Sequence, residues 1–363
     1  MTILYKYCYY SNIPYIRRFF KCFPLQEKKI IASLIATVTL TSLIPFTVAA
    51  ASKDFKEIEE AVNFDMVKVG DLDVRVYEDG RVKGLGKSKS EKVPKNDRKK
   101  ILKIMGFSEK EIDTLPEEMQ EELIADGGVK VDSEVEYEPT FYTDLDGVEH
   151  IVTEKNKEKI QKIARKDFER LQENELVNKE ITGDVKIAGT DLGDYKEGDF
   201  KGWGYIVYHG IEDGEYEYSY YTKFEWSSRP ILYFTDRVAH AWQSHTTSVK
   251  TTADYDVTHF SSSGRKLGSF DFDPDIEQDV YGSMAEIDID YHEGIHEGYV
   301  KDKVRIPKSH KGQTGQFVSK YVHSSAPKYI DGFSIGYGPL SITIKGSNWV
   351  YSWRNTFKIG NDY

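Results

Sequence analysis

The sequence predicts a mostly β protein, with a C-terminal antiparallel β domain over residues 200–363 that is a β-sandwich or resembles a jelly roll. Aromatic residues, which favour strands, are abundant, because the 363 residues include 25 Tyr and 18 Phe. After residue 200, apolar and polar side chains alternate with the period of two that is typical of strands. These runs follow one another closely without a helical pattern between them, whereas a parallel sheet would need crossover helices.

Residues 1–51 have the order of a secretory signal region. Two lysines precede an apolar run over residues 30–48, and Ala49 to Ala51 match the small-residue pattern of a cleavage site. This predicts a cleaved signal peptide, with cleavage near Ala51/Ser52, and a secreted protein that is extracellular or associated with the cell wall. A permanent membrane anchor is not expected, because Thr, Ser and Pro dilute the apolar run.

Both cysteines, Cys8 and Cys22, precede the predicted cleavage site. The mature chain would therefore be disulfide-free and would depend on its core or on bound metal for stability. Residues 1–24 are long for the start of a signal region, and the sequence leaves open whether they are translated. The acidic formal net charge of -11 excludes nucleic acid as a partner, because phosphate binding requires a basic surface.

Residues 52–94 are predicted to form a short β-hairpin segment followed by a linker. Apolar and polar residues alternate in "MVKVGDLDVRVYEDGRVKGLG", in which Asp79-Gly80 is a favoured hairpin turn. The charged stretch "KSKSEKVPKND" then reads as a linker.

Residues 95–128 are predicted to form a small helical unit. Gly106 suits the left-handed conformation that closes a helix, and Gly127 ends the last helix. The stretches "SEKE" (108–111) and "TLPE" (114–117) match the capping box that starts a helix. The unit could serve in docking or be a pro-region that is removed during maturation, but a structural subdomain is favoured.

Residues 129–199 are predicted to be a linker that contains one amphipathic helix at about 154–171. Apolar residues recur there at spacings of three and four, which places them on one face of a helix. They are Ile160, Ile163, Ala164, Phe168 and Leu171.

From about residue 200 the pattern changes to strands. In "EYEYSYYTKFEW" (215–226), aromatic residues lie on one face and mostly charged residues on the other, which predicts a half-buried strand. Similar runs are "WGYIVYHG", "PILYFTDRVAHAW", "AEIDIDY", "GQFVSKYVH", "LSITIKG" and "NWVYSWRNTFKI".

Residues 292–296, His-Glu-Gly-Ile-His, match the H-E-x-x-H pattern of zinc proteases. In that pattern His292 and His296 would bind zinc from one helical turn, and Glu293 would be the catalytic residue that polarises the water. In a strand, residues four apart lie roughly 13 Å apart and cannot share a metal ion. Because Gly294 and Gly298 disfavour a helix, the sequence favours a polar strand edge or loop over a zinc site.

The acidic stretch "DFDPDIEQD" places carboxylates at alternate positions. They are Asp271, Asp273, Asp275, Glu277 and Asp279. Oxygen ligands of this kind suit calcium, which is plentiful outside cells. The EF-hand pattern is not met, because Ile276 stands where its glycine should be. A solvated acidic loop is therefore favoured over a calcium site, but calcium is the one cofactor that the sequence suggests.

Two further stretches admit two interpretations each. The first, residues 224–245, contains Trp226, Arg229, Asp236, His240, Trp242 and His245. These side chains could stack on sugar rings and hydrogen-bond to them, or they could form a buried core, which we favour.

The second stretch, residues 248–273, could form an amphipathic hairpin with Gly264 at its turn, as a membrane-active protein would need.

The sequence therefore favours a non-catalytic extracellular binding or surface module with a Tyr/Trp-rich β-sandwich. Its partner would be a cell-wall or surface glycan, or another protein. The first alternative is a secreted β-rich toxin or membrane-active protein, and the second is a zinc hydrolase that uses the 292–296 motif.

Overall fold

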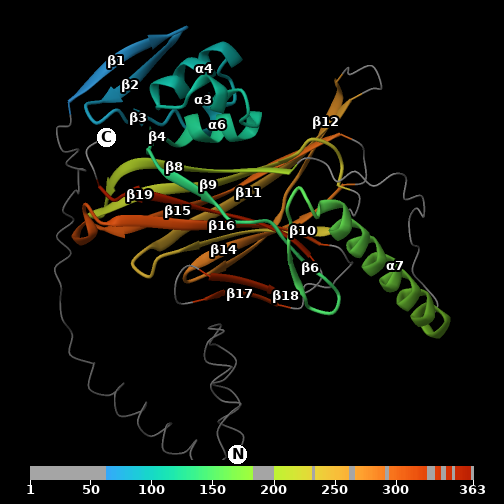
Figure 1. Cartoon of the computed structure of the whole chain (residues 1–363). Coiled ribbons are helices and arrows are strands. Elements are labelled where there is room, and N and C mark those ends of the chain that lie inside the picture. Colours follow the sequence, from blue (N-terminus) through green and yellow to red (C-terminus); the bar gives the residue numbers. More distant parts are fainter. Residues whose placement is uncertain are drawn as a thin grey trace, which may run out of the picture. The chain divides into compact units, whose positions relative to one another are not determined.

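The computed structural model describes residues 63–182, 200–230, 234–260, 266–290, 294–324, 332–336, 341–345 and 348–360 (Figure 1). The predicted signal region and its cleavage site lie outside the described residues. Residues 61–363 belong to one compact unit, so the helical unit and the β domain are parts of one body. Within the part of the chain that is described, no helix is both long and apolar enough to cross a membrane.

Most of the described chain is arranged in two antiparallel sheets, which confirms the predicted fold class. One sheet has nine strands. In spatial order they are β1 (Phe64–Val69), β2 (Leu72–Tyr77), β3 (Val82–Lys83), β4 (Gly127–Lys130), β8 (Phe200–Glu212), β9 (Glu215–Trp226), β15 (Ile295–Pro307), β11 (Thr247–Phe260) and β12 (Lys266–Phe272).

The second sheet has eight strands. In spatial order they are β13 (Asp275–Asp279), β14 (Gly282–Asp288), β10 (Thr235–Trp242), β16 (Thr314–Ser324), β19 (Asn348–Lys358), β6 (Phe141–Thr143) and β7 (Glu149–Ile151), while β5 (Glu134–Tyr137) also pairs with β19. A separate two-stranded sheet consists of β17 (Gly332–Gly336) and β18 (Ser341–Lys345).

The helices are α3 (Lys87–Ser90), α4 (Lys95–Ile104), α5 (Glu109–Ile112), α6 (Glu117–Asp126) and α7 (Lys157–Thr182), with a 3-10 helix, η1 (Lys308–His310). Ser108 caps α5 with the predicted capping box. The second predicted box is wrong, because Pro116 precedes α6 without a side-chain cap. The hydroxyl of Thr114 instead donates to the carbonyl of Glu111.

The interior of the sandwich is filled by the inward-facing aromatic residues of both sheets. On β9, alternate residues from Tyr216 to Trp226 point inward, as predicted. Tyr220 stacks on Phe317 of β16 with ring centroids 4.6 Å apart, and Phe224 lies 5.0 Å from Tyr321. Burial of such large apolar side chains is the main stabilising term of the fold.

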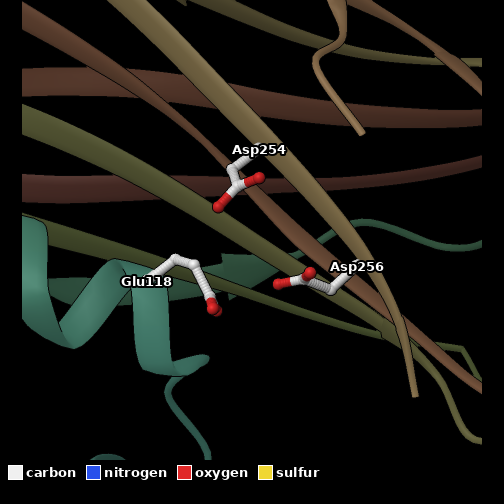
Figure 2. A group of neighbouring side chains, drawn as sticks. All are labelled: Glu118, Asp254 and Asp256. Carbon is white, nitrogen blue, oxygen red and sulfur yellow. The ribbon is translucent and has the colours of Figure 1, made fainter. Parts of the chain in front are cut away.

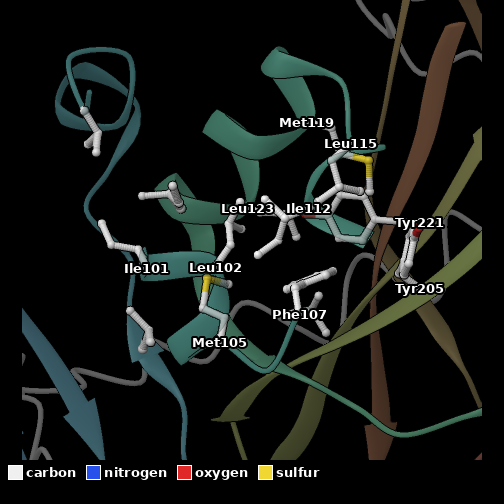
Figure 3. Packing of buried hydrophobic residues seen from close by; sticks show 14 of the residues in the cluster. Ile101, Leu102, Met105, Phe107, Ile112, Leu115, Met119, Leu123, Tyr205 and Tyr221 are labelled. Carbon is white, nitrogen blue, oxygen red and sulfur yellow. The ribbon is translucent and has the colours of Figure 1, made fainter. Parts of the chain in front are cut away.

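Part of the opposite face of the nine-stranded sheet, at β8, β9 and β15, is covered by the helical unit (Figure 3). Leu102, Phe107 and Leu123 of that unit belong to the same apolar cluster as Tyr205 of β8 and Tyr221 of β9. The expectation that β9 is half-buried is therefore wrong, because residues on both of its faces are covered. The sequence does not show this, because the charged residues on that face are held in ion pairs, such as Lys223 with Glu225 and Glu217 with Arg305.

The predicted linker over residues 129–199 contributes strands to both sheets. Strands β4 to β7 begin at Gly127 and end at Ile151, and β5 is exposed at all four of its residues. Short exposed strands lack the alternation of a half-buried strand, which explains why the pattern did not reveal them. The predicted amphipathic helix is α7, which extends to Thr182 and packs Ile160 and Ala164 against Trp349.

Candidate functional site

A surface cleft of about 460 Å³ lies where the first residues of β8 approach β19 and the end of β5. Its volume is in the range of small-molecule binding sites. Five of its ten lining residues are aromatic. The lining consists of Tyr137, Glu138, Thr140, Phe200, Lys201, Gly202, Trp203, Tyr351, Ser352 and Trp353. The cleft therefore combines apolar ring surface with a few polar and charged groups.

The cleft exists because β8 lacks a neighbouring strand along its first half. Strand β4 pairs with β8 only at Val207 and Tyr208 among the described residues. Side chains satisfy the carbonyl groups of the remaining edge instead. The hydroxyl of Tyr137 donates to the carbonyl of Gly202 at 3.3 Å, and the side-chain amide of Asn355 donates to the carbonyl of Gly204 at 3.2 Å.

The floor of the cleft is a packed set of aromatic rings. Phe200 stacks on Tyr351 with centroids 4.1 Å apart and an interplanar angle of 30°. The ring of Trp353 lies so close to the backbone of Gly202 that a Cβ there would be 2.3 Å from the indole. Residue 202 therefore has to be glycine, and the rings are held rigidly before any ligand binds.

The rim of the cleft carries groups that can hydrogen-bond. Tyr137 is 60% exposed, and its ring centroid lies 6.4 Å from that of Trp353. Desolvation raises the pKa of the Tyr137 hydroxyl above its usual range, so the group stays protonated and keeps its hydrogen bond to the carbonyl of Gly202. Lys201 pairs with Glu225 at 3.6 Å, and the exposed Glu138 lies 4.0 Å from Arg354. Such an arrangement can bind a ligand but offers no activated nucleophile.

A second group of polar side chains lies between α6 and the outer face of β11 (Figure 2). Carboxylate oxygens of Glu118, Asp254 and Asp256 all lie within 4.8 Å of one another. Asp271 of β12 is opposite Asp256 in the strand register and also approaches Asp254. Oxygen donors at this spacing could hold a divalent cation.

Burial and like charge raise the pKa of both aspartates on β11. The pKa of Asp254 rises to about 7, because the group is buried and lies beside Asp271. The pKa of Asp256 rises to about 8, because it is buried and shares a hydrogen bond with Glu118. Two carboxylates that are close together cannot both ionise readily, so protons are shared within this group near neutral pH.

The acidic stretch that predicts calcium crosses between the two sheets. Asp271 belongs to β12, and residues 275–279 form β13, a fully exposed edge strand of the other sheet. Of its five carboxylates, only Asp271 reaches the group around Asp254, as described above. The sequence did not reveal Asp254, Asp256 and Glu118 as a group, because Glu118 lies on α6, far along the chain from the two aspartates of β11. Calcium binding by this region stays a prediction.

For the zinc motif, the structure describes His296 but not His292 or Glu293, which lie outside the described residues. His296 is fully buried in β15, and its Nδ1 lies 2.6 Å from the hydroxyl of Tyr255. The conformation from residue 295 onward is a strand, as the alternation predicts. The zinc hydrolase itself stays a prediction.

Four of the six residues named in the aromatic stretch belong to the core, since Trp226, Asp236, His240 and Trp242 are buried. Arg229 and His245 are only partly buried, and residues 231–233 lie outside the described residues. The residues that line the cleft were missed as a group, although "WGYIVYHG" and "NWVYSWRNTFKI" were recognised as strands. The signal that could have found them is the pairing of Trp with nearby glycines, since bare backbone lets a large ring lie against it.

A fully buried polar layer crosses the sandwich at His240. Its Nδ1 lies 2.5 Å from a carboxylate oxygen of Asp302, and its Nε2 contacts the hydroxyl of Thr222, which in turn contacts Ser319. Ser283 donates to the same carboxylate at 2.5 Å. The arrangement resembles a Ser-His-Asp triad, but all five side chains have no exposed surface, so the layer joins the two sheets and cannot meet a substrate.

The predicted hairpin near residues 248–273 is present as β11 and β12, which pair antiparallel at the edge of the nine-stranded sheet. Its predicted turn at Gly264 lies outside the described residues. Leu267 is 67% exposed, and the adjoining strand β13 exposes Ile276. The hairpin is therefore edge-exposed and partly apolar.

No family model matches the chain, and no curated protein matches it either. A DUF4466 family protein from Parabacteroides merdae is 12% identical, with 42% of this chain and 44% of that one covered and a TM-score of 0.21. The NetB toxin of Clostridium perfringens in its membrane-inserted form is 10% identical, with coverage of 46% and 97% and a TM-score of 0.23. The collagen-binding domain of the Erysipelothrix rhusiopathiae surface protein RspB is 6% identical, with coverage of 43% and 57% and a TM-score of 0.20. Similarities this low carry no functional argument.

Proposed function

We propose that this protein is a non-catalytic extracellular binding module that holds a carbohydrate chain in the cleft between β8 and β19. The observation that carries the proposal is the rigid aromatic floor with polar groups at its rim. A sugar ring has one apolar C–H face and a border of hydroxyl groups. The face can stack on an aromatic ring while the hydroxyls bond to polar side chains, and rings held in place lose little entropy when the ligand binds.

Different residues of the rim would stack on the sugar and hydrogen-bond to it. The exposed ring of Tyr137 is the stacking platform that a ligand meets first. Glu138 can accept hydrogen bonds from sugar hydroxyls, and Lys201 can donate them. The predicted signal region supports an extracellular location, where cell-wall and surface glycans are available as partners.

Binding to soluble cell-wall and surface oligosaccharides tests the proposal. We expect Tyr137→Ala to weaken binding about fivefold, because one stacked ring contributes about 1 kcal/mol. Tyr137→Phe keeps the ring and should bind as the wild type does. Phe64→Ala removes an exposed aromatic ring from β1 and serves as the matched control. Isothermal titration calorimetry on the best oligosaccharide measures these affinities.

Two outcomes would contradict the proposal. One is that no oligosaccharide binds; the other is that Tyr137→Ala binds as tightly as the wild type. The first alternative function, a membrane-active protein, is favoured by the edge hairpin β11–β12 with its exposed Leu267. Dye release from liposomes, lost in Leu267→Asp and kept in Tyr137→Ala, would support that alternative instead.

A further inference from the structure

The open edge of β8 presents backbone groups to the cleft as well as rings. The carbonyls of Gly202 and Gly204 face away from β9, because they accept hydrogen bonds from side chains of β5 and β19. The carbonyl of Ile206 faces the same way and accepts from the N–H of Val131 at 2.8 Å. In an antiparallel pair, the N–H and the C=O of one residue point to the same side of the strand. The N–H of Gly202, a residue that lines the cleft, therefore points into it.

This N–H lacks the acceptor that a neighbouring strand would supply. Among the described residues, β4 pairs with β8 only at Val207 and Tyr208, so no described strand lies beside Gly202 on this side. The edge is closed again at Gly204, whose carbonyl is bonded to the side chain of Asn355. The open stretch is too short for an added strand, which is usually at least about three residues long. It has the length of a single amide group.

The opposite wall of the cleft offers hydrogen-bond acceptors. Thr140 and Ser352 line the cleft and carry hydroxyl groups. The C=O and N–H of a trans amide point in opposite directions, which is how a peptide group in a middle strand bonds to both of its neighbours. An amide in the cleft can therefore accept from Gly202 on one side and donate to a hydroxyl on the other.

We propose that the cleft recognises an N-acetylated amino sugar, whose acetamido group accepts from the N–H of Gly202 and donates to Thr140 or Ser352. This inference rests on the proposed carbohydrate function and names the class of sugar. An acetamido group is one trans amide attached directly to a sugar ring. Its methyl group packs on the aromatic floor, where Phe200 and Tyr351 are stacked. A hydroxyl in the same position of the sugar has neither the carbonyl nor the methyl group.

Two tetrasaccharides with the same linkage separate this inference from the proposed function. N-acetylchitotetraose carries an acetamido group on every ring, and cellotetraose carries a hydroxyl in its place. We expect the full chain to bind N-acetylchitotetraose at least about tenfold more tightly in isothermal titration calorimetry, because two hydrogen bonds depend on the acetamido group. Equal affinities, or binding of neither sugar, would overturn the inference. The carbohydrate function fails only if the other oligosaccharides do not bind either.

Removal of the hydroxyls from the opposite wall tests the second hydrogen bond. Thr140→Val/Ser352→Ala nearly keeps the shape of the wall and should weaken binding of N-acetylchitotetraose about fivefold, with the affinity for cellotetraose unchanged. Thr143→Val changes a threonine of β6 outside the cleft lining and serves as the matched control, which should alter neither affinity. A double variant that keeps the full preference for N-acetylchitotetraose would overturn the inference.

Amide hydrogen exchange followed by mass spectrometry tests the first hydrogen bond and needs no variant. N-acetylchitotetraose should slow exchange in peptides that contain Gly202, and cellotetraose should slow it less. Acetylated and amidated pentaalanine, which carries amides without a sugar ring, should not displace the tetrasaccharide. Displacement by this peptide would show that β8 accepts an added strand, and equal exchange with the two sugars would show that Gly202 does not bind the amide. Either result would overturn the inference.

Discussion

The acidic side of α6 meets the nine-stranded sheet in opposite ways at its two ends. At the C-terminal end, Glu122 and Asp126 face a lysine. The Nζ of Lys301 lies 2.6 Å from a carboxylate oxygen of Glu122 and 2.8 Å from one of Asp126. Burial alone would lower the pKa of Lys301, but these two carboxylates raise it, so the ammonium stays charged where it is 3% exposed.

At the N-terminal end, one turn earlier, Glu118 faces Asp254 and Asp256 instead. Residues four apart lie on the same side of a helix, so the two ends present the same chemistry to the sheet. What differs is the strand beneath them. One stripe of acidic residues therefore stabilises the helix–sheet contact where β15 supplies a cation, and opposes it where β11 supplies more carboxylates.

Removal of the cation should have the largest effect. Lys301→Met leaves Glu122 and Asp126 without their buried partner, and we expect a loss of about 3 kcal/mol in the free energy of unfolding. Urea denaturation at neutral pH measures it. Lys303→Met is the matched control, because that lysine is more exposed and should cost less than about 1 kcal/mol. Equal losses for the two variants would contradict the comparison.

At the N-terminal end of α6, the repulsion between carboxylates should make stability depend on pH. The pKa values of Asp254 and Asp256 are raised in the folded chain, so between about pH 4 and pH 8 the folded state binds more protons than the unfolded state. Stability from these groups therefore falls as pH rises through that window. We expect the wild type to lose roughly 2 kcal/mol between pH 6 and pH 8.5, a value reduced for solvent screening.

The double variant Asp254→Asn/Asp256→Asn is the control for this slope. Neutral amides keep the shape and remove the repulsion, so the variant should be nearly flat across the same window. Thermal melts at a series of pH values measure both chains. A wild type that gains stability as pH rises would show that other groups dominate.

The strands of the core could be predicted from the sequence, and the site could not. Strand β9 begins at Glu215 and ends at Trp226, as the alternation indicates, because local periodicity records which face is apolar. Strand β5 has no apolar face that would show in its sequence. It is exposed throughout and pairs with β19 more than 200 residues later, so its position depends on a contact that no local pattern contains.

The same limit applies to both groups of functional candidates. Tyr137, Phe200 and Trp353 come from three distant segments, and each reads locally as an ordinary strand aromatic. The acidic run drew attention to Asp271, but the aspartates that it approaches stand on β11, and Glu118 stands on a helix. Local spacing shows that charges are present, whereas tertiary pairing decides whether they are neutralised.

Calcium should have the smallest effect on stability, but this effect should be confined to the N-terminal end of α6. If the carboxylates around Asp254 hold a cation, millimolar calcium at pH 8 should raise the melting temperature by a few degrees, equivalent to about 1 kcal/mol, because the ion replaces the missing lysine. The gain should vanish in Asp254→Asn/Asp256→Asn and persist in Asp275→Asn/Glu277→Gln, which changes only the exposed strand β13. A gain that vanishes in Asp275→Asn/Glu277→Gln and persists in Asp254→Asn/Asp256→Asn would place calcium on the acidic stretch instead. If calcium leaves the melting temperature of the wild type unchanged, the carboxylates around Asp254 bind protons but not calcium.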